Sequence, residues 1–281
     1  MPTSSSRPIA LAAPRFHRPL PSADIRPARL RPARRYRPWL GGSGGVGVAL
    51  LVAAAIGISP LAVGGAHAAV LHVPGDYPSI QAAISAASSG DVVMVAEGEY
   101  FEEITLRAGV VVQGAGEERS IINGGGDYGD VVRAIGNDIE SSAKLLGFTV
   151  TGAISGGGMP GGAGVFCNSG ASPEIANCRF RGNDFGVATW NGAAPLVHNN
   201  VVVDNTFDGI DINSSPIVVN NTIAFNNIGI ADGGGYRPPV MNNIVTNNTL
   251  RGISASSQPY APTLSYNDVW GNGEDYHNCV P

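Results

Sequence analysis

Cysteine and lysine are both scarce in this sequence, which has three cysteines and a single lysine, Lys144, among its 281 residues. Three is an odd number of cysteines and their positions show no disulfide framework, so the fold is not expected to depend on disulfide bonds. The histidines give no sign of a zinc site either. After residue 68 they stand at His72, His198 and His277, without the spacing of metal ligands.

Basic residues are also rare after residue 68. Residues 69–281 hold eight basic and 21 acidic side chains, a net charge of −13, whereas residues 1–68 hold nine arginines and one acid, Asp24. An acidic surface repels phosphate groups, so nucleic acid and anionic membranes are excluded as partners of this larger part. Glycine and proline are abundant, with 39 and 20 residues, beside many valines and isoleucines. This composition favours a folded, turn-rich β protein.

Residues 1–68 are predicted to be an export signal. A long Arg/Pro-rich n-region that includes "RPARLRPARRYRPW" precedes the apolar run "GVGVALLVAAAIGISPLAVGG" and an A-x-A cleavage site at Ala66-His67-Ala68. The apolar run approaches the length of a membrane span, so an uncleaved anchor is the alternative. The small residues before the cleavage site favour cleavage, and no second hydrophobic span follows. We expect an exported protein that is extracellular, at the cell surface or periplasmic, with no membrane contact after cleavage.

A repeat of about 22 residues runs through the second half of the sequence. It is marked by prolines at 173, 195, 216, 238 and 262, with apolar residues two and seven positions after each. Asparagine stands ten positions after every one of these prolines and five positions after all but the first, where Cys178 takes its place. The asparagines of the two sets are Asn200, Asn221, Asn243 and Asn267, and Asn183, Asn205, Asn226, Asn248 and Asn272. Alternation of apolar and variable positions indicates strands with one face inward.

The fixed asparagine spacing predicts two ladders of side chains. In a parallel β-helix, successive coils stack about 4.8 Å apart, so equivalent residues at a turn lie above one another. Each amide then donates to the coil on one side and accepts from the coil on the other. Cys178 takes a ladder position and is expected to be a small buried residue.

The sequence therefore predicts an all-β fold, a parallel β-helix of about eight coils over residues 91–281, most regular over 173–281. Residues 69–90 are expected to form an N-terminal strand and an amphipathic helix, because "YPSIQAAISAAS" places its isoleucines on one face. A solenoid exposes unpaired groups at its end, and this helix is expected to cap them.

The stretch "VPGDYPSIQAAISAASSGDVVMVAEGEYFEEITL", followed by "GVVVQGAG" and the repeats, resembles the secreted bacterial right-handed parallel β-helix proteins of the pectate-lyase-like superfamily, which has the pectin-lyase fold. The resemblance covers residues 70–281. It implies right-handed coils and makes extracellular polysaccharide the expected partner, but it leaves the activity open because this superfamily includes lyases, esterases, hydrolases, epimerases and adhesins.

Two enzyme classes of that superfamily fit poorly. Gly98, Tyr100 and Glu102 match the G-x-Y-x-E of pectin methylesterases, but the catalytic aspartate segments of those enzymes have no counterpart. "NTFDGIDI" resembles polygalacturonase-like hydrolases, but Phe207 interrupts their N-T-D pattern and their other motifs are missing. If the protein is an enzyme, a polysaccharide lyase, which needs calcium and an arginine base, is the favoured class.

Polar and aromatic residues of the middle coils form the candidate site. A substrate-binding patch is expected from Arg179, Arg181, Asp184, Trp190, His198, Asp208 and Asp211, with the two arginines one coil before His198. Asp211 and Asp232 are the candidate calcium ligands because they are one coil apart. When positions are counted from the proline of each repeat, the two aspartates are equivalent and their carboxylates are expected to stack. When positions are counted from the preceding glycine, one side chain is expected to point outward and the other inward.

The main hypothesis is an exported β-helix protein that binds, and in one version processes, extracellular polysaccharide. The alternatives are a calcium-dependent polysaccharide lyase and a structural or adhesin-like solenoid without catalytic activity. The last repeat stops after Asn272 without a further strand or helix to cover it. We therefore also expect self-association through the C-terminal coil.

Overall fold

The computed structural model describes residues 67–156 and 161–280. These belong to the second of two compact units of the chain, residues 62–281. The predicted n-region and apolar run of the export signal lie outside the described residues. Within the described residues, no helix is long and apolar enough to cross a membrane.

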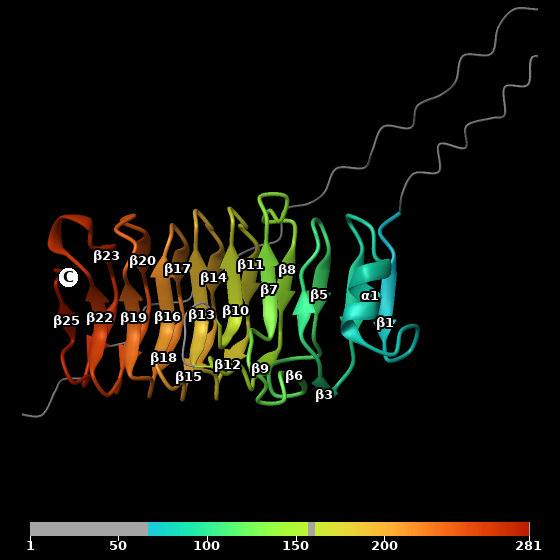
Figure 1. Ribbon diagram of the computed structural model, residues 1–281, viewed down its shortest axis with the longest axis horizontal. Helices are drawn as coiled ribbons and strands as arrows, with labels where there is room; N and C mark the ends of the chain where they lie inside the picture. Colours follow the sequence, from blue (N-terminus) through green and yellow to red (C-terminus); the bar gives the residue numbers. More distant parts are fainter. Residues whose placement is uncertain (1–66, 157–160, 281) are drawn as a thin grey trace, which may run out of the picture. The chain divides into compact units, whose positions relative to one another are not determined.

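The described unit is a parallel β-helix in which each coil contributes one strand to each of three parallel sheets (Figure 1). Sheet A has nine strands, which are β1(Val70–Val73), β2(Val92–Val95), β5(Val111–Gln113), β8(Lys144–Leu146), β11(Glu174–Ala176), β14(Leu196–His198), β17(Ile217–Val219), β20(Pro239–Met241) and β23(Thr263–Ser265). Sheet B has eight, which are β3(Gly98–Phe101), β6(Ser120–Asn123), β9(Thr149–Thr151), β12(Arg179–Phe180), β15(Val201–Val203), β18(Thr222–Ala224), β21(Ile244–Thr246) and β24(Asp268–Trp270).

Sheet C also has eight strands, which are β4(Ile104–Thr105), β7(Val132–Ile135), β10(Ala163–Asn168), β13(Phe185–Trp190), β16(Asp208–Asn213), β19(Ile228–Asp232), β22(Arg251–Ala255) and β25(Tyr276–His277). The helical elements of the described residues are α1(Ile80–Ala86) and the 3₁₀ helix η1(Gln258–Tyr260). The prediction of an all-β parallel solenoid is confirmed, with eight or nine strands per sheet against about eight expected coils. The expectation that no strand follows Asn272 is wrong, because β25 pairs with β22 in sheet C.

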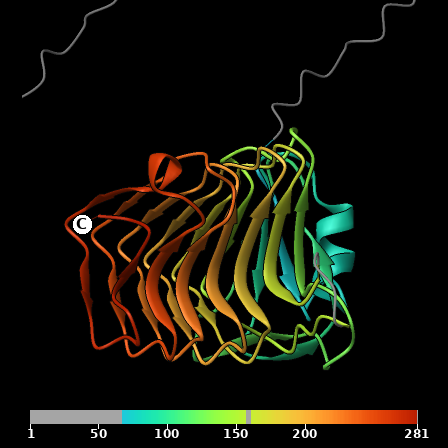
Figure 2. The same cartoon turned by 60° about the vertical axis from the view of Figure 1, so that its left-hand side comes forward.

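The core consists of columns of apolar side chains that repeat from coil to coil. In sheet B, for example, Val150, Phe180, Val202, Ile223 and Val245 pair in sequence and are fully buried. Burial of each such side chain contributes about 1.5–3 kcal/mol relative to exposure. The stacking of the coils is visible from the side in Figure 2. The interior is thus filled mainly by apolar side chains, and charged groups are left to the outside.

The first asparagine set lies between sheets A and B. The backbone N–H and Nδ2 of Asn200 both donate to Oδ1 of Asn221, at 3.0 and 3.1 Å, and Asn221 donates in the same way to Asn243. Asn243 donates likewise to Asn267, and Nδ2 of Asn221 also reaches the carbonyl of Val197 in the preceding coil. These buried amides satisfy one another across the coils.

The second set lies between sheets B and C and has the same geometry. The backbone N–H of each asparagine donates to Oδ1 of the asparagine in the next coil, in the order Asn183, Asn205, Asn226, Asn248 and Asn272. At Asn272 the acceptor is Oδ1 of Asp275, which receives both the backbone N–H, at 3.1 Å, and Nδ2, at 2.9 Å.

The residue before each asparagine of the first set adopts a left-handed conformation. Asn199, Asn220 and Asn242 have φ between 55° and 58°. Asparagine tolerates this conformation better than most residues, which explains the Asn-Asn pairs of the sequence. Cys178 is fully buried, and burial raises the pKa of its thiol to about 12, so it is an unreactive packing residue.

A glycine of sheet C faces each asparagine of the second set from the inside. A Cβ on Gly209 would lie 2.9 Å from Nδ2 of Asn226, and one on Gly229 would lie 2.8 Å from Nδ2 of Asn248. A Cβ there would also meet the backbone carbonyl of the next coil's glycine and a core side chain, so a larger residue would disturb both the amides and the stacking of the coils.

Helix α1 covers the first coils, with Ile80, Ala83 and Ile84 buried (Figure 2). Both oxygens of the Glu102 carboxylate accept hydrogen bonds from its N-terminus, from the backbone of Ile80 and Gln81, at 2.9 Å each. A helix N-terminus has unpaired N–H groups that such a carboxylate satisfies. The glutamate of the G-x-Y-x-E motif thus holds α1 on the solenoid.

We predict that Asn221→Ala destabilises the protein more than Asn227→Ala. Asn221 is buried and its side chain takes part in two asparagine contacts, so its removal leaves buried groups without partners and costs about 1–3 kcal/mol. Asn227 is only partly buried, and its side chain accepts one bond, from Thr249. Thermal melting of both variants measures the difference, and equal melting temperatures would contradict it.

We also predict that Glu102→Ala lowers the free energy of unfolding by about 0.5–2 kcal/mol, because the N-terminus of α1 loses its carboxylate. Urea unfolding provides the measurement. Glu140→Ala is the control, since Glu140 is exposed and its side chain makes no hydrogen bond or ion pair among the described residues. A Glu102 variant as stable as the Glu140 variant would show that the contact does not matter.

Candidate functional site

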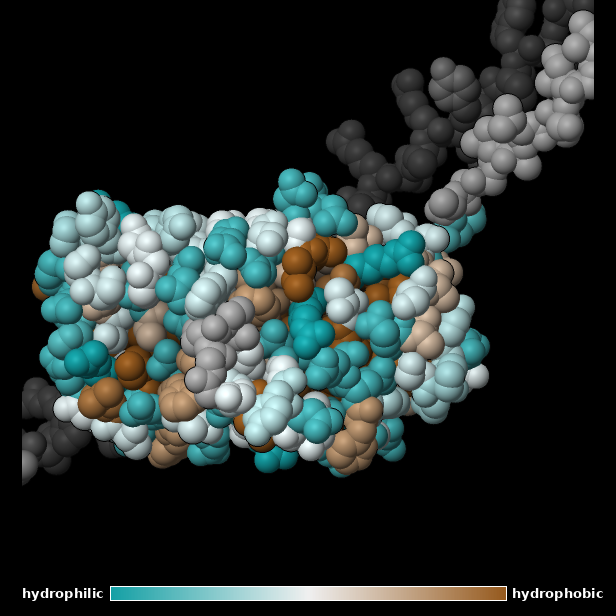
Figure 3. All heavy atoms as spheres, viewed as in Figure 1, coloured by the Kyte–Doolittle hydropathy of each residue, from teal (hydrophilic) through white to brown (hydrophobic). Residues whose placement is uncertain are grey.

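The outer face of sheet C carries acidic, basic, aromatic and small side chains in regular columns. One outward column runs through Arg133, Phe166, Ala188, Asp211, Ala231, Ser254 and His277. Beside it, Asp208, Ile228 and Arg251 form a second column, and Trp190 pairs with Asn213 in a third. Parallel stacking thus aligns acidic, basic and aromatic groups along one face. In the space-filling view, hydrophobic patches lie between hydrophilic ones (Figure 3).

An apolar cluster lies on this face, separate from the core. Ala163, Phe166, Phe185 and Ala188 are buried, and Trp190 packs against them while staying partly exposed. Phe207 extends the cluster toward solvent, with 42% of its surface exposed and its ring centroid 5.4 Å from that of Phe185. The cluster offers flat aromatic surface beside the acidic groups.

Two aspartates next to this cluster, Asp208 and Asp211, have raised pKa values. Burial raises the pKa of Asp211 to about 6, although hydrogen bonds from Trp190 Nε1, at 3.3 Å, and from Asn213 Nδ2 favour its charged form. Burial, together with the charge of Asp211, raises the pKa of Asp208 to about 7. Between these values Asp208 holds its proton while Asp211 is mostly ionised.

A hollow of about 350 Å³ adjoins these aspartates toward the C-terminal coils. Its lining includes Asp211, Asp232, Arg251, Ser254 and His277. Oδ1 of Asp232 accepts from the backbone N–H groups two and three residues further on, whereas Oδ2 is buried and has no hydrogen-bond partner among the described residues.

Arg251 also has unused hydrogen-bonding capacity at this hollow. Its Nε lies 3.5 Å from a carboxylate oxygen of Glu274, close enough for an ion pair but not aligned for a hydrogen bond. The same carboxylate oxygen lies 2.9 Å from Nδ1 of His277. Oδ2 of Asp232 and Nε of Arg251 are themselves buried, so the groups that can reach a ligand here are the other polar atoms of Arg251 and the side chains of Asp211, Ser254 and His277.

The sequence of residues 108–273 matches the family model described as the right handed beta helix region. The chain belongs to the right-handed β-helix family. The resemblance noted in the sequence and the handedness of the coils are thereby confirmed. No curated protein matches this β-helix protein.

Several solved structures are similar to this β-helix. The A-module of mannuronan C-5 epimerase AlgE4 from Azotobacter vinelandii is 22% identical, with a TM-score of 0.45, over 69% of this chain and 67% of that one. Alginate lyase from Paenibacillus sp. str. FPU-7 is 13% identical, with a TM-score of 0.44, over 76% and 99%. Dettilon tailspike protein is 16% identical, with a TM-score of 0.41, over 72% and 50%.

The β-helix distributes the expected substrate-binding residues over three sheets. Trp190, Asp208 and Asp211 lie together on sheet C. His198 lies on sheet A, where its Nε2 is 3.1 Å from Oε1 of Glu174, and Asp184 accepts hydrogen bonds from the backbone and hydroxyl of Ser155.

The expected alignment of the arginines with His198 does not form. Arg179 pairs with Val201 in sheet B, and the residue one coil before His198 is Ala176. The turn between sheets A and B separates them, because the chain changes direction between Ala176, the last residue of β11, and Arg179, the first residue of β12. Arg179 and Arg181 line a different hollow on sheet B.

Counting from the glycine of each repeat, and not from the proline, gives the positions that the candidate calcium ligands Asp211 and Asp232 occupy in sheet C. Asp211 pairs with Ala231, and Asp232 pairs with Ile212, a core residue. The two carboxylates are therefore not stacked in the same column, which corrects the expected stacked pair. In the described ranges, 67–156 and 161–280, no group of three or more histidine, cysteine, aspartate or glutamate side chains is arranged to hold a metal ion.

Sequence reasoning missed Arg251, Ser254 and His277 at the hollow. One signal was available for Ser254, since it stands two residues after a repeat glycine, as do Ala188, Asp211 and Ala231. That column lies on the outer face of sheet C throughout. Aligning the repeats on glycine would thus have found part of the face.

We predict that Asp208→Asn stabilises the protein at pH 8 and not at pH 4. The pKa of Asp208 is raised by folding, from 3.8 to about 7, so the folded state favours the protonated form. Its contribution to stability is fully present below pH 3.8 and is lost as the pH rises through about 7. Asparagine cannot ionise, so the variant avoids this loss, on the order of 1–3 kcal/mol.

Thermal melting at the two pH values tests this. Asp204→Asn, at a turn of the same coil, is the control and is expected to shift the melting temperature equally at both. A gain for Asp208→Asn that is the same at pH 4 and pH 8 would contradict the raised pKa.

Proposed function

We propose that this β-helix is an exported protein that binds an extracellular polysaccharide along the outer face of sheet C. The observation that carries the proposal is the hollow on this face, where Asp211, Arg251, Ser254 and His277 line one space beside the partly exposed Trp190. Protein groups of this kind bond sugar hydroxyls, and the neighbouring aromatic surface suits the apolar face of a sugar ring.

The shape of the face suits a polymer rather than a small molecule. Outward columns continue through neighbouring coils, from Arg133 in β7 to His277 in β25. Coils stack about 4.8 Å apart, so outward side chains of successive coils are spaced at distances comparable with the length of a sugar unit. A chain lying along the solenoid would meet the aromatic cluster, the two aspartates and the hollow in turn.

A second candidate function, cleavage of the bound polysaccharide, is favoured by the pair Asp208 and Asp211. Their pKa values of about 7 and 6 lie near neutral pH, so Asp208 keeps a proton for a larger fraction of the time than Asp211 does. That combination is the requirement for a general acid beside a general base. In this version the protein is a lyase or a hydrolase, and calcium dependence remains part of the lyase proposal.

We predict that Trp190→Ala weakens polysaccharide binding about tenfold, because a partly exposed tryptophan bonded to Asp211 is the main aromatic contact of the face. Affinity gels with alginate, mannuronan, polygalacturonate and a neutral glucan measure binding. Trp270→Ala is the matched control, since Trp270 is 51% exposed on the outside of sheet B.

The same mixtures, with and without calcium, are read for new reducing ends and for ultraviolet absorbance of unsaturated products. Reducing ends without absorbance indicate hydrolysis, and both together indicate a lyase. Equal binding by the Trp190 and Trp270 variants would reject sheet C as the site. No binding by the wild type to any polysaccharide would favour the structural or adhesin-like alternative.

A further inference from the structure

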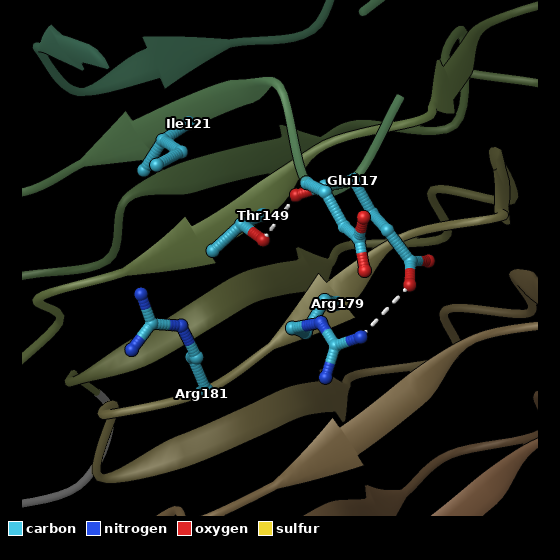
Figure 4. A pocket seen from close by; sticks show the side chains of 6 residues that line it. Glu117, Ile121, Thr149, Arg179 and Arg181 are labelled. Atoms are coloured by element: carbon cyan, nitrogen blue, oxygen red, sulfur yellow. Dashed lines mark hydrogen bonds and ion pairs between the residues drawn. The ribbon is translucent and has the colours of Figure 1, made fainter.

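A second hollow, of about 340 Å³, lies on the outer face of sheet B. Its lining comes from three strands and a loop, and consists of Glu117, Glu118, Ile121, Thr149, Arg179 and Arg181 (Figure 4). Its volume lies at the lower end of the range for small-molecule sites, about 300–1,000 Å³. It faces away from sheet C, so nothing in the proposed function uses it.

One wall of the hollow is fixed by long-range contacts. Nη2 of Arg179 lies 3.0 Å from Oε1 of Glu117, which is 62 residues away in the sequence. The hydroxyl of Thr149 donates to the backbone carbonyl of Glu117. The loop that carries Glu117 and Glu118, between β5 and β6, is thereby held over the sheet, and the Arg179 guanidinium is oriented.

Arg181 is the unmatched charge of this hollow. It is exposed, and its guanidinium makes no hydrogen bond or ion pair with the described residues. Figure 4 shows it across the hollow from Glu117. A guanidinium has five N–H donors and no acceptor, and its planar fork fits the two oxygens of a carboxylate or sulfate. Arg179 stands two residues earlier, on the same face of the sheet, but its charge is offset by Glu117, so Arg181 carries the free positive charge of the hollow.

We propose that this hollow binds an oxyanion group, a carboxylate or sulfate, carried by a saccharide unit, with Arg181 as the anion-binding residue. The exposed carboxylate of Glu118 at the rim would accept from hydroxyls of the same unit and would repel a second anionic group. The site therefore suits one charged group attached to a neutral polyol. It is independent of the polysaccharide face on sheet C.

NMR shift titration at low ionic strength tests the proposal with glucuronate, glucose and inorganic sulfate as probes. Wild type is expected to bind glucuronate and not glucose, and Arg181→Gln is expected to weaken glucuronate binding at least tenfold. Arg181→Lys keeps the charge but loses the planar fork, so it is expected to fall between the two. Arg237→Gln, which removes another exposed arginine, is the matched control and is expected to bind like wild type.

The outcomes separate the alternatives. Sulfate binding that depends on Arg181, without glucuronate binding, supports the oxyanion site and rejects the saccharide. The proposal is overturned if wild type and Arg181→Gln bind glucuronate with equal affinity, or if glucose causes the same shifts as glucuronate. It is also overturned if wild type binds neither anion. Trp190→Ala is expected to leave glucuronate binding unchanged, so failure on sheet B and failure on sheet C are distinguishable.

Discussion

The amide contacts between stacked asparagines are the constraint on which the rest of this structure depends. Each buried amide must lie one coil spacing from the next, because otherwise several buried donors and acceptors would lose their partners at once. This requirement fixes the lengths of the turns from sheet A to sheet B and from sheet B to sheet C. It also requires the glycines of sheet C, since a Cβ on Gly209 would meet the amide of Asn226.

The composition of the outer face of sheet C follows from that constraint. Gly209 and Ile210 both face inward at the start of β16, so Asp208 and Asp211, three residues apart, both remain outside. With the interior filled by aliphatic columns, charged and aromatic groups can vary on the outside without disturbing the coil. The structural and functional demands on the sequence are thus separated by position within each repeat.

The repeat made most of the fold predictable. Prolines, asparagines and glycines at fixed spacing specify two turns and a strand direction, which is the pattern of a parallel β-helix. The register of sheet C was less certain, because the stretch from Asp211 to its partner Ala231 is 20 residues, whereas the prolines that precede them, at 195 and 216, are 21 residues apart. The turn before β19 is one residue shorter than the turn before β16, and only the glycine count anticipates that Asp232 turns inward.

The candidate site was predictable only in part. Trp190, Asp208 and Asp211 lie on neighbouring strands of sheet C, β13 and β16, so their proximity could be inferred from the repeat. The hollow on sheet B could not, since Glu117 reaches Arg179 from a loop outside the regular repeats. The G-x-Y-x-E motif had a structural reason that spacing alone does not reveal, because the partner of Glu102 is the N-terminus of a helix more than 20 residues earlier.

The central claim, that the outer face of sheet C binds polysaccharide, is tested most directly by a crystal structure of the protein soaked with an oligosaccharide that it retains in affinity gels. The account predicts sugar density along sheet C, with a ring against Trp190 and hydroxyls within hydrogen-bond distance of Asp211, Arg251 or Ser254. Sugar density confined to the other faces, with sheet C bare, would contradict it.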